Sequence, residues 1–132
     1  MTGIGPAESK DYGGQPITSN ILVSGLRIES TGGDGVFAMN ATNISITNVD
    51  SNKNYRQGIS IVDVDGLLVE NCSFRNTNGT GPSDGIDMEP DGASQRLHRI
   101  IIRNVHCANN TGGALGPSRH PNEFIRWWRT IN

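Results

Sequence analysis

Aromatic residues and long apolar runs are both scarce in this chain of 132 residues. Aromatic residues make up 5% of the sequence and hydrophobic residues 34%. No apolar run approaches the roughly 20 residues that a membrane-spanning helix needs, and the polar first ten residues do not have the form of a secretion signal. We therefore expect no membrane partner, and we expect no signal peptide in this chain.

Positive charge is not in excess either. Eleven Lys and Arg residues stand against 13 Asp and Glu residues, which gives a net charge of −2. Proteins that bind nucleic acid or anionic membranes do so largely through surplus Lys and Arg. We therefore expect no nucleic-acid partner.

Glycine and asparagine are abundant, and the apolar residues recur at a fixed period. Four segments read apolar, any, apolar, any, Asn or Gly, apolar, which is strand alternation followed by a bend. They start 23, 23 and 33 residues apart, at Ile21, Ile44, Leu67 and Ile100. A second short strand follows in each unit, at Gly35, Gly58 and Gly85, with a weaker copy at Gly113. A disordered chain would not show such a period.

Repeating units of this kind stack like residues over like, with equivalent strands about 4.8 Å apart. The predicted interior columns are Ile21, Ile44, Leu67 and Ile100, followed by Val23, Ile46, Val69 and Ile102. A third column holds the bend residues Asn48, Asn71 and Asn104, and another corner holds Asn76 and Asn109. Asn suits these corners because it tolerates left-handed backbone geometry, and because stacked amides hydrogen-bond along the axis.

These units resemble the right-handed parallel β-helix superfamily of pectate lyases, polygalacturonases, alginate lyases and epimerases, and phage tailspikes. The resemblance implies an all-β solenoid of about four to five rungs over residues 19–116, and an extracellular or cell-surface origin. It is specific for the fold and weak for function, because the superfamily hosts several chemistries and some non-enzymes. A β-sandwich is the competing fold, but it does not require equivalent side chains at a 23-residue step.

The two ends of the chain depart from the repeat. Residues 1–18 are predicted to be a flexible lead-in or N-terminal cap, and residues 117–132 a C-terminal cap or tail. Phe124, Trp127, Trp128 and Ile131 fall at helical spacing. The favoured interpretation is a short capping helix or tail that covers the last rung, since open solenoid ends invite aggregation. The alternatives are a helix that binds a membrane surface or nucleic acid, through its Arg and Trp residues, and a tail that is not native to the fold.

The two cysteines, Cys72 and Cys107, suit either one disulfide or two buried thiols. The repeat points both side chains inward on adjacent rungs, but two positions out of step. One rung of spacing combined with two residues along the strand separates the Cα atoms by roughly 8 Å, which is too far for a disulfide. Free thiols are predicted.

The most acidic stretch is the strand SDGIDMEPD, which carries Asp84, Asp87, Glu89 and Asp91. Alternation sends Asp87 and Glu89 to the outer face, in two outward columns that also contain Phe37 and Ser60, and Met39 and Val62, respectively. Longer insertions flank this strand on both sides. Such carboxylates can act as acid and base in sugar hydrolysis, coordinate Ca²⁺, or accept hydrogen bonds from sugar hydroxyls. The structural alternative is that they only oppose aggregation on a solvated strand.

The string SDGID is similar to the NTDGID motif of polygalacturonases, and only Asp84 carries over cleanly from that motif. The resemblance would place an Asp pair on the next rung, but Thr111-Gly112-Gly113 stands there instead. The Gly-His-Gly and Arg-x-Lys motifs of that family do not occur either. Polygalacturonase activity is therefore not expected from this chain alone.

Other outward positions complete the candidate site. Arg56 is expected to contact a sugar carboxylate beside the candidate acids Asp84, Asp87 and Glu89, while Phe37, Tyr55 and Gln57 are candidate substrate contacts. Asp87, Glu89 and Asp91 are candidate Ca²⁺ ligands, and no other cofactor is indicated. The expected partner is an acidic polysaccharide or oligosaccharide. The binding hypothesis has the module hold this ligand without turnover, and the enzyme hypothesis has it act as a lyase, epimerase or glycoside hydrolase. The alternative is a purely structural solenoid fragment that associates end-on or as a trimer.

Overall fold

The computed structural model describes residues 18–90, 95–116 and 123–131, the last range by its backbone. Eleven strands are described, and they form two sheets. The larger sheet has seven strands, namely β1 (Thr18–Ser24), β2 (Arg27–Glu29), β4 (Ala41–Thr47), β5 (Asp50–Asn52), β7 (Val64–Arg75), β9 (Leu97–Ala108) and β11 (Glu123–Ile131). The smaller sheet has four, namely β3 (Val36–Ala38), β6 (Ile59–Ile61), β8 (Asp84–Met88) and β10 (Gly113–Gly116).

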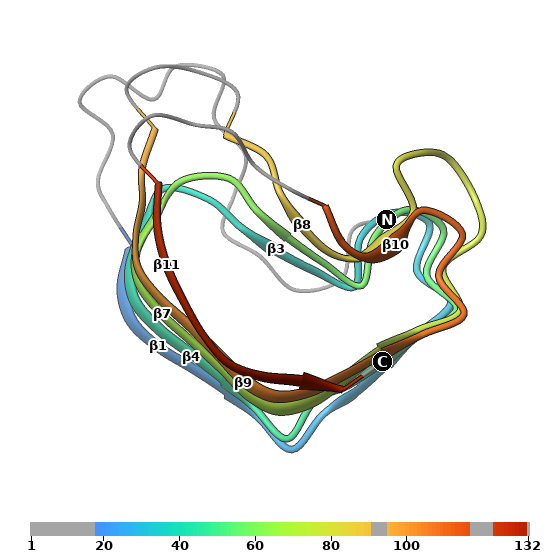
Figure 1. Ribbon diagram of the computed structural model, residues 1–132, viewed down its shortest axis with the longest axis horizontal. Coiled ribbons are helices and arrows are strands. Elements are labelled where there is room, and N and C mark those ends of the chain that lie inside the picture. The colour runs from blue at the N-terminus through green and yellow to red at the C-terminus, as the bar shows by residue number, and fades with distance from the viewer. Residues whose placement is uncertain (1–17, 91–94, 117–122, 132) are drawn as a thin grey trace.

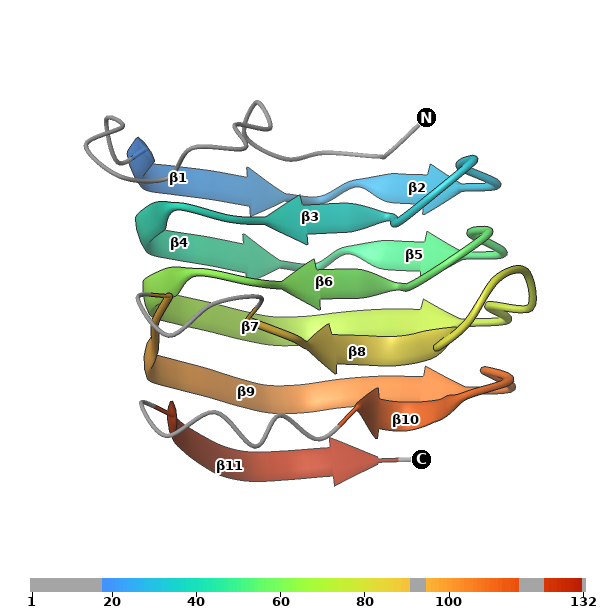
Figure 2. The same cartoon turned by 90° about the horizontal axis from the view of Figure 1, so that it is seen from above.

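Every strand pair in both sheets is parallel, and the chain alternates between the sheets as it coils. Viewed along the stack, equivalent strands of successive turns overlie one another (Figure 1). Viewed from the side, the turns lie one below the next from the N-terminal end to the C-terminal end (Figure 2). This arrangement is a parallel β-helix, so the fold predicted from the repeat is confirmed.

The register of the sheets confirms the predicted interior columns. Ile21 pairs with Ile44, Ile44 with Leu67, and Leu67 with Ile100. The column that begins at Val23 continues in the same way through Ile46, Val69 and Ile102. Most members of these columns are almost fully buried, and together they form the main hydrophobic core.

The predicted asparagine corners are also confirmed. Asn48, Asn71 and Asn104 all adopt left-handed backbone geometry, with φ between 51° and 55°. The Asn104 side-chain amide donates to the Asn71 carbonyl oxygen of the rung before it. At the other corner, Asn76 and Asn109 have φ of 59° and 55°. These asparagines let their rungs bend without glycine, whereas Gly25, with φ of 69°, occupies the corner before Asn48 in the first rung. The amide bond joins neighbouring rungs.

Both cysteines are buried free thiols, as predicted. Cys72 pairs in register with Val105, whereas Cys107 pairs with Phe74, so the two sulfurs stand two positions apart on neighbouring strands. Burial raises the pKa of Cys107 to about 12 and also raises the pKa of Cys72. The thiols therefore act as small core side chains and are not reactive nucleophiles.

The capping helix predicted near the C-terminus is wrong. Residues Glu123–Ile131 form strand β11, which pairs in parallel with β9 and has register shifts along its length. The segment is rich in Phe, Trp, Ile and Thr, which favour strands, and β9 offers it a row of unpaired backbone groups. The side-chain contacts expected of Phe124, Trp127, Trp128 and Ile131 lie outside the described residues, as do residues 1–17 of the lead-in.

The weak fourth copy of the short strand is shifted by one residue from its predicted alignment. Gly113 pairs with Asp84 and not with Gly85, and Leu115 pairs with Ile86. Gly113 has φ of 152°, and Gly116, in line with Asp87, ends strand β10. The shift places Gly116 next to the acidic strand, which matters for the site below.

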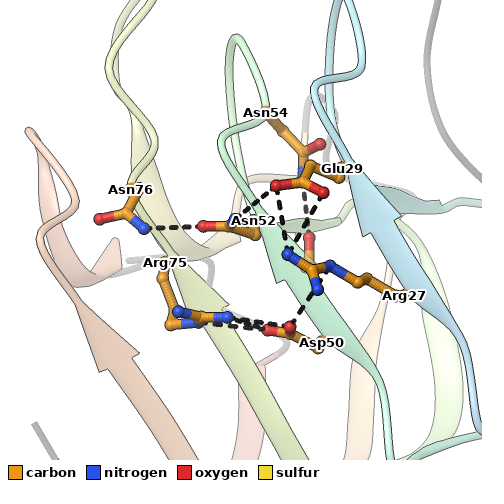
Figure 3. A network of polar contacts seen from close by, with 8 residues as sticks. Arg27, Glu29, Asp50, Asn52, Asn54, Arg75 and Asn76 are labelled. Atoms are coloured by element: carbon orange, nitrogen blue, oxygen red, sulfur yellow. Dashed lines mark hydrogen bonds and ion pairs between the residues drawn. The ribbon is translucent and has the colours of Figure 1, made fainter.

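A polar network crosses the rungs on the larger sheet, at strands β2, β5 and β7 (Figure 3). Arg75 donates to both carboxylate oxygens of Asp50 at 2.9 Å, while Arg27 lies 3.3 Å from Glu29 and 4.0 Å from Asp50. Asn52 donates to Glu29 at 2.9 Å. Each charged group faces an opposite charge on its own or a neighbouring rung, so the network supports stacking.

Three glycines at the short strands of the smaller sheet, Gly35, Gly58 and Gly85, sit where no side chain fits. A Cβ on Gly58 would stand 2.4 Å from the carbonyl oxygen of Gly85 and 2.7 Å from the Phe74 Cβ. We expect Gly58→Ala to lower the free energy of unfolding by about 2 kcal/mol, because the neighbouring backbone must move. Urea denaturation measures this loss. Gly81→Ala is the matched control, since a Cβ there meets nothing within 4 Å, and equal losses in the two variants would contradict the packing argument.

Candidate functional site

The candidate site lies on the outer face of the smaller sheet, where the predicted outward columns are formed. Phe37 pairs with Ser60, Ser60 with Asp87, and Asp87 with Gly116. These side chains are buried although they point away from the main core. Asp84 and Asp87 are only 6% and 5% exposed. The alternative that these acids merely coat a solvated strand is therefore wrong for both of them. Among the described acids of this strand it applies to Glu89, whose side chain is 56% exposed, while Asp91 lies outside the described residues.

A small pocket of about 50 Å³ opens on this face, and residues of the first three turns line it. Its lining includes four candidate site residues and two residues of the outward columns, Ser60 and Val62, to which the sequence analysis gave no role. They are Phe37, Arg56, Ser60, Val62, Asp87 and Glu89. One side of the pocket is therefore apolar and the other carries two carboxyl groups and a guanidinium group.

Gln57 lies behind the pocket and positions Asp84 and Asp87 through hydrogen bonds. It is fully buried. Its side-chain amide donates to Asp87 Oδ2 at 3.0 Å, and its carbonyl oxygen accepts from the backbone N–H of Asp84 at 2.7 Å. The Gln57 backbone N–H donates in turn to Asp34 Oδ1 at 3.2 Å. The predicted role of Gln57 as a substrate contact is therefore wrong, because no ligand can reach a side chain with no exposed surface.

The carboxyl groups of Asp84 and Asp87 converge on Gly116 of the next rung. A Cβ at Gly116 would stand 2.5 Å from Asp84 Oδ2 and 2.8 Å from Asp87 Oδ1. At Gly112, a Cβ would stand 2.6 Å from Asp84 Oδ1. The glycines leave room for the two acids, which any side chain in these positions would displace.

Arg56 spans the rim of the pocket. Its guanidinium group lies 3.8 Å from Asp34 and 3.7 Å from Glu89, and its side chain is 38% exposed. These are loose ion pairs, longer than the 2.7–2.9 Å of a charge-assisted hydrogen bond. Arg56 therefore keeps donor capacity for a ligand at the mouth of the site.

The carboxyl groups do not all ionise independently. Burial, the charge of Glu89, a hydrogen bond with the Glu89 side chain and the charge of Asp84 raise the pKa of Asp87 to about 7, against a smaller opposing effect of Arg56. Burial, followed by the charge of Glu89, raises the pKa of Asp84. Asp87 is therefore partly protonated near neutral pH, so its carboxyl group can act as donor or acceptor there.

Tyr55 stands apart from the pocket. Its side chain is exposed, and its ring packs against Gly79 in the loop before β8, where a Cβ would stand 2.4 Å from the ring. Phe37 does line the pocket, but it is 9% exposed and packs with Met39 and Val62 in a second hydrophobic cluster. Of the three predicted substrate contacts, only Phe37 therefore reaches the pocket, and it offers little of its ring to a sugar.

The candidate calcium ligands are incomplete within the described residues. Asp87 and Glu89 are neighbours, whereas Asp91 lies outside the described residues. Among residues 18–90 and 95–116, no group of three His, Cys, Asp or Glu side chains could hold a metal ion. Ca²⁺ takes six to eight oxygen ligands, so the described residues alone do not build a calcium site.

The sequence analysis placed Ser60 in the outward column of Phe37 and Asp87 but gave it no role. It is 3% exposed, and within the described residues its Oγ is a buried polar side-chain atom without a hydrogen-bond partner. A buried hydroxyl without a partner costs free energy. The signal was present in the sequence, because Ser60 aligns between Phe37 and Asp87.

Two larger hollows lie on the other sheet, and both are open. One follows the asparagine bend, is about 650 Å³ in volume and is lined by Leu26, Arg27 and Asp50 among others. The other, of about 400 Å³, lies beside Leu68 and Ile101. Arg27 and Asp50 are engaged in the polar network described above (Figure 3). Neither hollow combines buried acids with an unpartnered hydroxyl, so the pocket at Ser60 is the better candidate.

Comparison with known proteins agrees with the fold. A family model described as "right handed beta helix region" matches residues 8–124. Neither the search of curated proteins nor the search of solved structures returned a match. No helix long and apolar enough to cross a membrane occurs in the described part of the chain.

Proposed function

The chain belongs to the family of right-handed β-helix regions, and from that premise we propose that it is a carbohydrate-binding β-helix module. Its ligand is an acidic polysaccharide, held against the outer face of the smaller sheet by the pocket of Arg56, Asp87 and Glu89. The observation that carries the proposal is the burial of Asp84 and Asp87 on an outward face of the solenoid.

The buried acids have no role in folding that an apolar pair would not fill better. Bringing two carboxyl groups beside Glu89 costs free energy, which appears as the raised pKa values of Asp84 and Asp87. Shifted carboxyl pKa values that gather around one pocket are typical of functional sites. Gln57, on the rung before, forms hydrogen bonds with both residues, and Gly116, on the rung after, leaves room for their carboxyl groups. The cluster is therefore part of the fold.

Arg56 makes the site suitable for a ligand that carries carboxylates. A guanidinium group at the rim can donate two parallel hydrogen bonds to a uronate carboxylate. The apolar wall of Phe37 and Val62 gives a hydrophobic surface beside it. The pocket is too small for a sugar ring, so a ring bound at its mouth would present only a substituent to these walls.

Binding fits the geometry better than hydrolysis by the Asp87–Glu89 pair. Retaining glycosidases need their two carboxyl groups about 5 Å apart, and inverting enzymes need about 6.5–9.5 Å. Asp87 is only 5% exposed, and the space that it shares with Glu89 is about 50 Å³. A sugar ring does not fit into that space, so a glycosidic bond cannot be placed between the two acids.

Calorimetric titration with pectate, alginate, chondroitin and neutral glycan oligomers, each with Ca²⁺ and with chelator, tests the proposal. We expect an acidic oligomer to bind, and we expect Arg56→Ala to weaken it by about tenfold or more, since a hydrogen bond to a charged group contributes about 1.5–3 kcal/mol. Incubation of the same oligomers with the protein, followed by analysis of their length, tests for turnover.

Arg99→Ala is the matched control for Arg56→Ala. Arg99 is also a partly exposed arginine, but it pairs with Asp65 at 2.7 Å on the larger sheet. The variant Arg99→Ala should therefore leave binding unchanged. Equal weakening in both variants would indicate general attraction to positive charge, and no heat of binding with any glycan would remove the proposal.

A further inference from the structure

The pocket at Ser60 has a definite chemistry that an acidic ligand alone does not match. The Ser60 hydroxyl is buried without a partner, and the carboxyl groups of Asp87 and Glu89 line the same space. Asp84 lies directly behind them, and Arg56 contributes the single positive charge of the lining. The interior of the pocket is therefore rich in acceptor oxygens and surrounded by net negative charge.

The size of the space limits what can enter. A cavity of about 50 Å³ holds one small substituent and excludes a sugar ring. A carboxylate in this position would face Asp87 and Glu89 at short range, where like charges repel. Water would supply a partner for Ser60 but would leave the negative charge uncompensated. The best match is a small group that carries positive charge and only donates hydrogen bonds.

A primary ammonium group meets these conditions. It has three donor hydrogens and no acceptor, and the pocket offers three oxygen-bearing acceptor groups, from Ser60, Asp87 and Glu89. The ring of Phe37 in the wall adds a surface that attracts cations. We propose that the pocket binds the ammonium group of an unacetylated amino sugar, and that Ser60 is the residue that selects it.

This inference rests on the proposed function and specifies its ligand. The polysaccharide would carry both charges: a uronate carboxylate that Arg56 contacts at the rim, and a free amino group that enters the pocket. An N-acetylated sugar is excluded, because acetylation removes the positive charge and adds a carbonyl and a methyl group to a substituent that must fit the same small space.

The test compares two oligomers that differ only at the amino group. Chondroitin oligomers and their de-N-acetylated counterparts are titrated calorimetrically into the protein and into Ser60→Ala. We expect the de-N-acetylated oligomer to bind at least tenfold more tightly than the acetylated one, and we expect Ser60→Ala to abolish that difference. Ser60→Ala removes a hydroxyl without a partner, so the unliganded variant should melt at the same temperature as the wild type or higher.

Each other outcome overturns the inference in a distinct way. Equal binding of both oligomers by the wild type would leave the module a carbohydrate binder but remove the ammonium site. An unchanged preference in Ser60→Ala would remove Ser60 as its determinant. A lysine-rich peptide that binds as tightly as the amino sugar would show that the pocket recognises protein amines. Absence of binding by any oligomer would remove the proposed function as well.

Discussion

Gln57→Leu is expected to lower the free energy of unfolding by about 3 kcal/mol, because two buried groups lose their partner and each such loss costs about 1–3 kcal/mol. The backbone N–H of Asp84 and the carboxyl group of Asp87 both bond to the Gln57 side chain, which has no exposed surface. Leucine has a similar volume, so the change removes hydrogen bonds and leaves little cavity. Urea denaturation with fitted slope and midpoint measures the loss.

Ser60→Ala is the control for Gln57→Leu on the same face of the same sheet. Ser60 is also a buried polar residue of this wall, but its Oγ has no partner to lose. The variant should therefore retain the stability of the wild type. If Gln57→Leu proves as harmless as Ser60→Ala, the hydrogen bonds of Gln57 contribute no net stability, and the account of how the acids are held in place is wrong.

The fold was predictable because, in a solenoid, residues that pair on neighbouring rungs are separated by a constant number of positions in the sequence. Ile44 pairs with residues one unit away on each side, so the 23-residue step gives the register directly. The Asn corners were predictable for a related reason, since few residues tolerate left-handed geometry and the same type recurs at Asn48, Asn71 and Asn104. A fold with irregular connections would offer no such offset.

The ends of the repeat were harder to predict, because there a local pattern competes with an available edge. The spacing of Phe124, Trp127 and Ile131 fits a helix, but the same residues favour strands, and the unpaired edge of β9 selects pairing. At Gly113, a one-residue shift follows from a short strand with little side-chain volume to fix its register. Periodicity alone does not decide either case.

The candidate site was predicted in its location but not in its burial. Alternation correctly sends Phe37, Ser60 and Asp87 to the outer face. It does not reveal how deeply these side chains are buried, which makes Gln57 a wall residue and, within the described residues, leaves the Ser60 hydroxyl without a partner. The period of a repeat gives the side to which a residue points, but it carries no information about how exposed that residue is.

Asp87→Asn is expected to stabilise the protein at pH 8 and to have little effect at pH 4. The pKa of Asp87 is about 7 in the folded protein, against about 3.9 in an unfolded chain. Between these values the folded state holds a proton that the unfolded state releases. The contribution of Asp87 to the free energy of unfolding is therefore fully present below about pH 4. It falls as the pH rises and is lost above about pH 7.

The expected gain at pH 8 is up to about 4 kcal/mol, since each pKa unit corresponds to about 1.4 kcal/mol. Asparagine keeps an oxygen for the bond from Gln57 and gains a donor for Glu89, but it carries no charge at any pH. Melting curves from pH 4 to pH 9 should show a rise of roughly 10 °C in Tm over the wild type at the alkaline end.

Asp50→Asn is the control, because it removes a carboxylate that pairs with Arg75 on the other sheet, and it should not raise Tm at pH 8. Parallel curves for Asp87→Asn and the wild type would mean that the pKa of Asp87 is the same in the folded protein as in the unfolded chain, and would contradict the prediction.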